Sequence, residues 1–303
     1  MKKKYLIIGG SGLLGVNWAV QKRDVCDIFI GLNKRVVDMK GVSAFSIDFS
    51  DQTSLESWIS MLKPDVVVNA AGLTSVEVCE NYPQEAFNAN VEIARKVSIA
   101  ANYSGAKVVQ ISTDHLYQGV IPSVDEQTLP EPVNQYGITK WKAEQVVLEA
   151  CPNALVIRTN FYGWGPQYRQ SFTDFIISHL RTGKIIRLFE DVYYSPILIS
   201  VLVNTIHELI KKGASGIFNV VGDERVSKLS FGKKVAEIFS LDQSLILSDS
   251  LAKRTGLVKR PLDMSLSNAK VVSFLGKPLG TMEEHLLLLK EEETKYYKEI
   301  IQL

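Results

Sequence analysis

Two side chains that can move a proton lie one helical turn apart in the middle of the chain. Tyr136 and Lys140 are separated by four positions, so a helix would place both on one face. A free tyrosine has a pKa near ~10. A lysine ammonium one turn away, together with an oxidised nicotinamide, favours the phenolate and lowers this pKa. Tyr136 can then act as the acid in a carbonyl reduction or as the base in the reverse oxidation, while Lys140 also holds the nicotinamide ribose.

A hydroxyl group that can contact the same substrate stands upstream of this pair. Thr113 follows a short apolar run, at the expected carboxyl end of a strand. Ligands of open α/β sheets bind outside those ends, so Thr113 can hydrogen-bond the substrate oxygen beside Tyr136. Taken alone, a threonine that caps a turn is the better interpretation. A glycine loop, a strand-end hydroxyl and a Tyr-x-x-x-Lys pair in this order are more specific than any one of them.

A glycine-rich loop directly follows the first apolar run of the chain. Gly9, Gly12 and Gly15 satisfy G-x-x-G-x-x-G. Such glycines make a tight turn, bring bare backbone against a pyrophosphate and allow a helix to pack closely on a strand. A plain structural turn is the alternative, but the strand–loop–helix context favours a dinucleotide at the helix N-terminus. The cofactor contacts expected from this loop are Gly9, Ser11, Gly12, Leu13, Leu14 and Gly15.

The end of the second apolar run indicates which nicotinamide cofactor is used. An acid there accepts the ribose 2′-hydroxyl of NAD, whereas a base suits the 2′-phosphate of NADP. This chain has Asn33, Lys34 and Arg35, which favours NADP(H), with NAD(H) as a second cofactor; solvated loop charges are the alternative. Asp48 and Phe49, after the third run, are placed to reach the adenine, although an aspartate there can also simply form a turn.

Short apolar runs alternate with longer helix-like stretches through the first 160 residues. The predicted strands are Tyr5–Ile8, Ile28–Ile30, Phe45–Ile47, Val66–Val68, Val108–Ile111 and Leu155–Ile157. The predicted helices are Leu13–Gln21, Thr53–Leu62, Pro83–Tyr103 and Tyr136–Glu149. The strands show little polar alternation, as expected when both faces are covered. This order predicts an α/β fold of the Rossmann type, with a doubly wound parallel sheet between helices.

The pattern loosens after residue 160 into a loop rich in glycine and aromatic residues. The predicted elements that follow are helices at Ser171–Arg181, Ile199–Lys211, Ser230–Phe239 and Met282–Ile301, and a strand at Ile217–Val221. That strand can rejoin the sheet. We therefore expect a nucleotide-binding domain over residues 1–160, rejoined by about residues 197–221, and a smaller C-terminal part over residues 161–303.

Composition and charge narrow the classes of partner. The 303 residues include 34 Lys and Arg against 33 Asp and Glu, so no broad attraction to nucleic acid or anionic membranes is expected. Cys26, Cys79 and Cys151 are too widely spaced for a disulfide framework, and the histidines show no metal-ligand spacing, so no metal is expected.

No apolar run reaches the ~18 residues of a membrane span. The first run is too short for a signal peptide, so we expect a cytoplasmic protein.

Six segments of the chain carry a family resemblance. They are Gly9–Gly15, Asp65–Gly72, Ser112–Asp114, Val133–Lys140, Arg158–Gly163 and Arg260–Leu266. With them the sequence resembles the extended short-chain dehydrogenases/reductases and, more narrowly, the dTDP-4-dehydrorhamnose reductase family, across essentially the whole chain. The resemblance implies a Rossmann domain with a small C-terminal substrate domain, reduction of a 4-keto sugar nucleotide by NAD(P)H, and a homodimer.

The resemblance also assigns roles by position. It implies that Thr113, Tyr136 and Lys140 form a catalytic triad. Further contacts that it implies are Ala70, Ala71 and Gly72 for the cofactor and Thr74, His115, Asn160, Phe161 and Arg260 for the substrate. The Arg260 guanidinium suits a nucleotide diphosphate, against the alternative of a charged loop residue before a proline. Asn90 stands where the superfamily often has an active-site asparagine, or else is a helix-surface residue.

Two departures from the family pattern concern the substrate. His115 stands where a substrate-facing tyrosine is expected, and Asn160 with Phe161 replaces the usual Ser-Trp. Both leave the proton chemistry intact and change the surface that would contact the sugar.

Three functions remain open on these residues. The leading hypothesis is an NAD(P)H-dependent reductase of a nucleotide-linked 4-keto-6-deoxy sugar. A sugar-nucleotide epimerase or dehydratase is the second, although dehydratases typically have Asp-Glu where this chain has Asp114 and His115. The third is a non-catalytic NADP-binding subunit, like the regulatory partner of methionine adenosyltransferase, against which the intact triad argues.

Overall fold

A parallel sheet of seven strands forms the centre of the protein in a computed structural model that describes residues 2–33 and 35–303. Its strands are β1 (Lys4–Ile8), β2 (Asp27–Leu32), β3 (Ser43–Ser46), β4 (Val66–Asn69), β5 (Lys107–Ile111), β6 (Leu155–Arg158) and β11 (Gly216–Asn219). They lie in the order β11-β6-β5-β4-β1-β2-β3, and all neighbours are parallel. The chain runs from β1 to one edge and returns to β4 on the other side of β1. This switch point is where open α/β sheets bind ligands.

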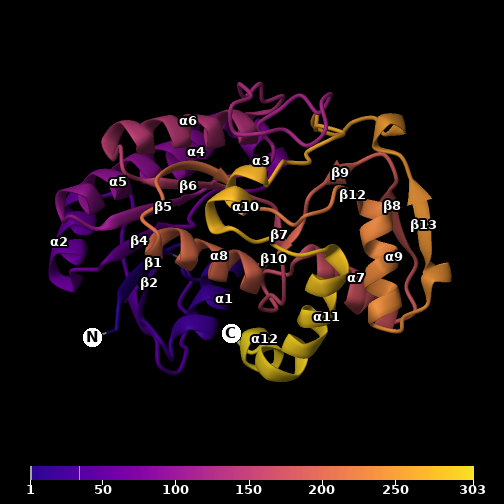
Figure 1. Cartoon of the computed structure of the whole chain (residues 1–303), viewed down its shortest axis with the longest axis horizontal. Helices are drawn as coiled ribbons and strands as arrows, with labels where there is room; N and C mark the ends of the chain where they lie inside the picture. The colour runs from indigo at the N-terminus through magenta and orange to yellow at the C-terminus, as the bar shows by residue number, and fades with distance from the viewer. Residues whose placement is uncertain (1, 34) are drawn as a thin grey trace.

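Helices cover both faces of this sheet because successive residues of each strand enter different cores. Tyr5 and Ile7 of β1 belong to one core, and Leu6 and Ile8 belong to the other. The second core is covered by α2 (Gln52–Leu62), α5 (Ile93–Tyr103) and α6 (Gln135–Ala150), and the first by α1 (Leu13–Lys22) and α8 (Ile199–Lys211) (Figure 1). The predicted fold class, a doubly wound parallel sheet of the Rossmann type, is confirmed.

The connection from β4 to β5 is more broken than the sequence predicts. Two short helices, α3 (Val76–Asn81) and α4 (Pro83–Phe87), precede α5, and a π-helical turn (Asn88–Glu92) joins α4 to α5. The predicted single helix over 83–103 is therefore wrong in its middle. Apolar spacing does not reveal the extra residue that a π turn accommodates, and such turns often lie beside functional sites.

The second half of the chain contributes both to the sheet and to a smaller body beside it. Its further elements are β7 (Phe161–Tyr162), α7 (Phe172–Arg181), β8 (Ile186–Phe189), β9 (Tyr193–Tyr194), β10 (Ile197–Leu198), β12 (Val226–Ser227), α9 (Lys228–Ile238), β13 (Ile246–Asp249), α10 (Ala269–Leu275), α11 (Met282–Glu292) and α12 (Lys298–Ile301). Figure 1 shows α7, α9, β8 and β13 packed together at one end, away from the central sheet. This half also supplies α8 and β11 to the sheet and its helix layer. The division of the chain into two domains near residue 160 therefore stays a prediction.

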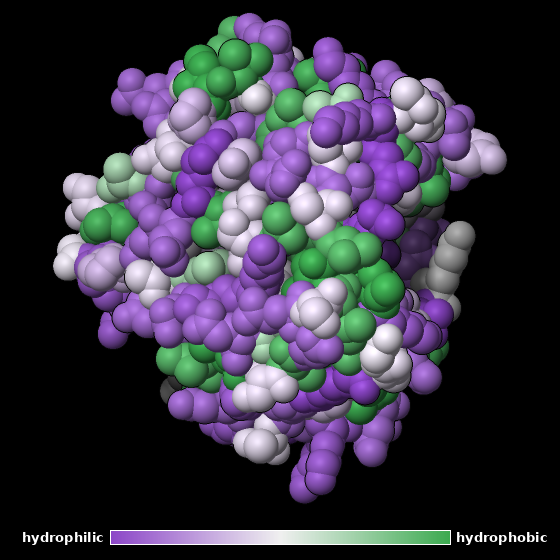
Figure 2. All heavy atoms as spheres, turned by 90° about the vertical axis from the view of Figure 1, so that its right-hand side faces the viewer, coloured by the Kyte–Doolittle hydropathy of each residue, from purple (hydrophilic) through white to green (hydrophobic). Residues whose placement is uncertain are grey.

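The sequence pattern does not predict the paired strands β8 and β13. Each has only four residues, and Arg187, Leu247 and Ser248 are exposed, so neither carries a long apolar run. Their parallel pairing joins segments far apart in the sequence. Figure 2 shows that the outer face of this end is mainly hydrophilic, with apolar residues gathered in a few places between the polar ones. Among the described residues, no helix has both the length and the apolar sequence needed to cross a membrane.

His207 of α8 connects the helix layer to the first strand of the sheet. Its ring stacks on Tyr5 with centroids 4.6 Å apart, and Trp18 Nε1 donates to its Nε2 at 3.1 Å. Because an indole N–H can only donate, the His207 proton lies on Nδ1, 3.2 Å from the Tyr5 hydroxyl. Burial, with the charges of Lys22 and Lys3, lowers the pKa of His207 to about 3.

We predict that His207 makes the protein less stable in mild acid. In the unfolded chain a histidine takes up a proton near pH ~6.5, whereas the folded ring stays neutral down to about pH 3. Its stabilising contribution is therefore complete above pH ~6.5 and is lost as the pH falls, by about 2 kcal/mol between pH 7 and pH 5. Urea unfolding of the native protein and of His207→Gln at both pH values measures this. Equal losses of stability in the two proteins would contradict the prediction.

Candidate active site

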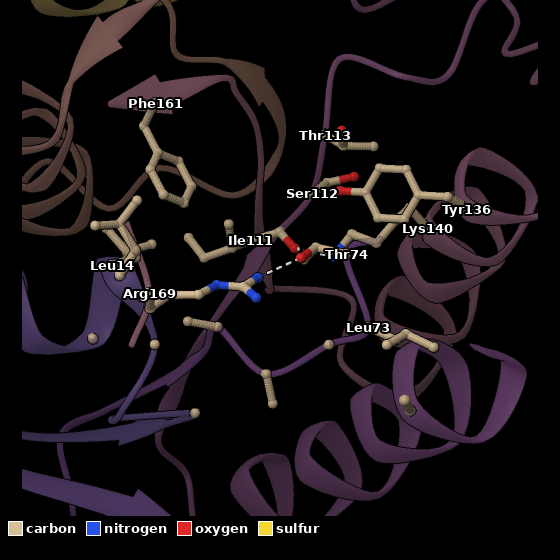
Figure 3. Close-up of a pocket in the computed structure, with 18 of the residues that line it drawn as sticks. Leu14, Leu73, Thr74, Ile111, Ser112, Thr113, Tyr136, Lys140, Phe161 and Arg169 are labelled. Atoms are coloured by element: carbon tan, nitrogen blue, oxygen red, sulfur yellow. Dashed lines mark hydrogen bonds between the residues drawn. The ribbon is translucent and has the colours of Figure 1, made fainter. Parts of the chain in front are cut away.

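A cavity of about 1000 Å³ opens at the carboxyl ends of β1, β4 and β5. The residues proposed from the sequence that line it are Gly9, Ser11, Gly12, Leu13, Leu14, Gly15, Asn33, Arg35, Phe49, Ala70, Ala71, Gly72, Thr74, Thr113, His115, Tyr136, Lys140, Asn160 and Phe161. Asp48 and Arg260 are not among the lining residues, and Lys34 lies outside the described residues. Figure 3 shows Thr113, Tyr136 and Lys140 on one side of the cavity, with Phe161 and Arg169 opposite.

The glycine loop between β1 and α1 forms a cradle of bare backbone. Gly9 has a φ of 82°, and a Cβ there would lie 2.7 Å from the Ala71 nitrogen, so only glycine fits. A Cβ on Gly15 would lie 2.7 Å from the Cα of Gly10, which explains how closely α1 approaches the loop. Gly12 caps α1 without a side-chain hydrogen bond. The first N–H groups of the helix can therefore bind a pyrophosphate, and the site fits a dinucleotide.

Tyr136 and Lys140 lie on α6, which begins where the Asn134 side chain accepts a hydrogen bond from the Gly137 nitrogen at 2.9 Å. Lys140 Nζ donates to the carbonyl oxygen of Ile111, at the end of β5, over 2.7 Å. This bond brings the ammonium to the strand end that also carries Thr113. Tyr136 and Lys140 are both buried, with 9% and 6% of their surfaces exposed.

Burial has opposite effects on the pKa values of these two groups. It raises the pKa of Tyr136 to about 12, although a hydrogen bond with Thr113 and the charge of Arg169 act to lower it. It lowers the pKa of Lys140 to about 8, against the attraction of Glu144. In the chain without cofactor the pKa of Tyr136 is therefore raised, because losing water costs the phenolate more than its neighbours return. The lowering expected beside an oxidised nicotinamide stays a prediction. Tyr136 is a protonated acid at neutral pH.

A buried ion pair holds the helix that carries both residues. The Glu144 carboxylate, one turn beyond Lys140, accepts from Arg158 Nη2 at 2.7 Å and from Nε at 3.0 Å. Glu144 also accepts from Ser112 Oγ, and Arg158 Nη1 donates to the Tyr117 hydroxyl at 2.7 Å. Both charged side chains are only 2% exposed. The predictions from the sequence do not include this pair. The one signal for it in the sequence is Arg158, a charged residue at the end of an apolar strand.

Asn90 is a buried structural link. Its Oδ1 accepts from the Leu73 nitrogen at 2.7 Å, and its Nδ2 donates to the Leu73 oxygen and to Thr139 Oγ1 at 3.1 and 2.9 Å. The side chain therefore ties the loop after β4 to α6, next to Lys140. Asn90 is not a cavity-lining residue, nor is it on the helix surface.

Two of the residues that depart from the family pattern, His115 and Asn160, contact residues next to the proposed catalytic group. Asn160 Nδ2 donates to Asp114 Oδ2 at 2.6 Å, and the His115 ring lies edge-on to Tyr136 with centroids 5.4 Å apart. Burial lowers the pKa of His115, so the ring is neutral at pH 7. His115 can therefore contact a substrate through neutral hydrogen bonds, and it packs directly on the acid.

Two residues proposed from the sequence are engaged elsewhere. The Asp48 carboxylate accepts hydrogen bonds from the nitrogen and hydroxyl of Ser50, at 2.8 and 2.6 Å, as a turn-forming aspartate does. Arg260 pairs with Glu77, and its Nε is a buried atom without a hydrogen-bond partner among the described residues. The structure thus brings neither residue into the cavity.

The cavity also contains residues that sequence analysis did not single out. Tyr168, Arg169 and Gln170 line it from the loop before α7, and Arg169 Nη2 donates to Thr74 Oγ1 at 2.5 Å (Figure 3). Glycine and aromatic content predicted a loop here. The contact between this loop and the glycine loop depends on tertiary packing, which a local sequence pattern does not predict.

A Rossmann sheet with a glycine cradle, a strand-end threonine and a Tyr-x-x-x-Lys helix defines the class of extended short-chain dehydrogenases/reductases. The sequence model of one family, described as the RmlD substrate binding domain, matches residues 3–294. The chain belongs to this family, which is that of the dTDP-4-dehydrorhamnose reductases, and the resemblance drawn from the motifs is confirmed.

Two curated relatives and one solved structure illustrate the likeness. The probable low-salt glycan biosynthesis reductase Agl14 of Haloferax volcanii is 26% identical over 295 residues, covering 96% of this chain and 98% of its own. A dTDP-4-dehydrorhamnose reductase of Salmonella typhimurium is 32% identical over 187 residues, covering 58% of this chain and 60% of its own. The crystal structure of dTDP-4-dehydrorhamnose reductase from Bacillus anthracis in complex with NADP is 26% identical, with a TM-score of 0.83, covering 96% of this chain and all of that one.

Because Arg158 and Glu144 are buried, removing either charge should be costly. Glu144→Gln leaves the Arg158 charge without its counterion, and we expect a loss of about 3–5 kcal/mol in the free energy of unfolding. Glu144→Leu combined with Arg158→Met should recover most of this loss. Urea unfolding followed by circular dichroism measures each variant.

The matched control is the exposed pair of Lys277 and Glu208, whose side chains are 52% and 41% exposed. Lys277→Gln should cost less than about 1 kcal/mol. A loss in Glu144→Gln no larger than in this control would refute the anchoring role.

Proposed function

We propose that this protein is an NAD(P)H-dependent reductase of a nucleotide-linked 4-keto-6-deoxy sugar. One observation carries the proposal: a buried, protonated Tyr136 stands with Thr113 and Lys140 at the edge of a cavity whose glycine cradle fits a dinucleotide. The names of the relatives and their coverage of nearly the whole chain support it.

The cofactor is proposed to be NADP(H), with NAD(H) as an alternative, and when bound it supplies a hydride to the substrate. Gly9, Gly12 and the α1 N-terminus would hold its pyrophosphate, and Lys140 its ribose. Arg35, an exposed cation at the cavity wall, would meet a 2′-phosphate. The other proposed contacts are Ser11, Leu13, Leu14, Gly15, Asn33, Phe49, Ala70, Ala71 and Gly72.

The chain supplies the proton for the reduction. As the carbonyl carbon accepts the hydride, Tyr136 donates its hydroxyl proton to the carbonyl oxygen, which becomes the alcohol oxygen of the product. Thr113, whose hydroxyl donates to Asp114 in the chain without ligands, would turn this hydrogen to the same oxygen and orient the carbonyl. The Lys140 ammonium stabilises the phenolate that remains on Tyr136. Among the residues that the structure describes, Lys140 Nζ donates to the Ile111 oxygen, which takes one of its three N–H groups and leaves the others for a ribose.

The substrate contacts are proposed from their positions. His115, Asn160, Phe161 and Thr74 line the cavity around the acid and would face the sugar and its nucleotide. Arg260 would meet the diphosphate from outside the present lining, after leaving Glu77. Its buried Nε, which has no partner in the described part of the chain, is consistent with a further ligand.

The other two functions are less well supported. The Asp114 carboxylate accepts from the Asn160 side chain at 2.6 Å, so it is already engaged and is a poor candidate for the acid–base work of a dehydratase. A purely regulatory NADP-binding subunit would not need a protonated Tyr136 beside Thr113. The homodimer and the cytoplasmic location also remain proposals.

Replacement of Tyr136 tests the reaction. Tyr136→Phe should lower kcat for NADPH oxidation by a dTDP-4-keto-6-deoxy sugar at least about 100-fold, because the proton donor is lost. Calorimetry should show nearly unchanged NADPH binding. Tyr103→Phe, at a tyrosine that is 90% exposed, is the matched control and should keep full activity. Full turnover by Tyr136→Phe, or no NADPH oxidation by the native protein with any 4-keto sugar nucleotide, would reject the proposal.

The pH dependence of reduction tests the role of Lys140. We expect kcat/KM to be level near pH 7 and to fall above about pH 8, where the Lys140 ammonium loses its proton, while Tyr136 stays protonated to about pH 12. The residual activity of Lys140→Arg, whose charge persists to high pH, should show no fall in this range. A level profile to pH 10 in the native protein would contradict the assignment.

A further inference from the structure

The loop before α7 reaches across the cofactor cavity to the opposite wall. From this loop, Tyr168 donates its hydroxyl hydrogen to the backbone oxygen of Ser11, in the glycine loop, over 3.0 Å. Its neighbour Arg169 donates to Thr74, on the loop after β4 (Figure 3). The second half of the chain therefore touches both nucleotide-binding loops.

This crossing loop is firmly built. The Asp174 carboxylate, in the first turn of α7, accepts from the nitrogens of Gly165 and Ser171 at 2.9 and 2.8 Å, and so joins the two ends of the loop. A Cβ on Gly165 would overlap the carbonyl oxygen of Arg169, so the loop folds tightly on itself. Tyr168 is thus presented from a fixed support.

The ring of Tyr168 carries the arginine that follows β2. The guanidinium carbon of Arg35 lies 3.9 Å from the ring centroid. In the described part of the chain, no carboxylate forms an ion pair with Arg35. A guanidinium over the face of an aromatic ring can keep N–H groups free for a planar or tetrahedral anion.

We propose that Tyr168 is a specificity-determining residue, which holds Arg35 where it binds the 2′-phosphate of NADP(H). The inference rests on the proposed function only through the identity of the cofactor. Arg35 is otherwise an exposed, flexible side chain, and stacking on Tyr168 reduces the conformations that it must lose when it binds a phosphate. Preference for NADP(H) over NAD(H) is then set jointly by a residue beside the sheet and a residue from the second half of the chain.

Binding of NADPH and NADH to the protein without any sugar nucleotide tests this inference. Arg35→Ala should weaken NADPH binding by about 10-fold or more and leave NADH binding nearly unchanged. Tyr168→Leu should reduce the preference for NADPH by about 2- to 5-fold, as expected for a partly exposed cation–ring contact. Tyr168→Phe, which loses only the bond to Ser11, should keep the preference.

The pair must also act as a unit. In the Arg35→Ala background, Tyr168→Leu should leave the ratio of the two dissociation constants unchanged. Equal weakening of NADPH and NADH by Tyr168→Leu, or an unchanged ratio in Arg35→Ala, would overturn the inference. Tyr168→Met keeps apolar volume without a ring, so it should reduce the preference for NADPH as much as Tyr168→Leu does. It replaces Tyr168→Leu in the test if that variant does not fold. Since no substrate is present, failure of the reductase proposal would leave these measurements unaffected.

Discussion

The buried pair of Arg158 and Glu144 is the contact on which the site geometry depends. It joins the end of β6 to the middle of α6, and through Ser112 it also holds the end of β5. Two charges removed from water are stable only when well paired, so the helix and the strand ends have one acceptable register. That register brings Lys140 to the Ile111 carbonyl and places the acid on the same helix beside Thr113.

Desolvation then defines the chemistry of the group that the pair positions. The same loss of water raises the pKa of the neutral acid Tyr136 and lowers that of the cation Lys140, so the site without cofactor is poised to donate a proton. The near-zero net charge of the chain is compatible with anionic ligands because the cavity already offers a helix N-terminus and three cations along its walls, Arg35, Lys140 and Arg169.

The parts that sequence patterns predicted well are those that depend on local burial. The apolar strands of the sheet, the glycine cradle and the helix that carries Tyr136 each leave a pattern within about a dozen residues. The patterns failed where a short segment is stabilised by a distant partner, as in the pairing of β8 with β13, or where a helix contains a π turn, as at Asn88–Glu92. Asp48 shows a related limit. An aspartate that forms a turn and an aspartate that contacts an adenine would both stand directly after a strand, so the sequence does not distinguish the two roles.

The sequence by itself determined the Rossmann sheet, the family and the residue types able to transfer a proton, since these follow from periodicity and from spacing along one chain. Only the tertiary structure decided that Glu144 meets Arg158, that Tyr168 lies under Arg35 and that Arg260 pairs with Glu77. It also decided the direction of the Tyr136 pKa shift. The physical reason is common to all of these: pairing and desolvation depend on which distant segments surround a group, and neighbours in sequence do not specify them.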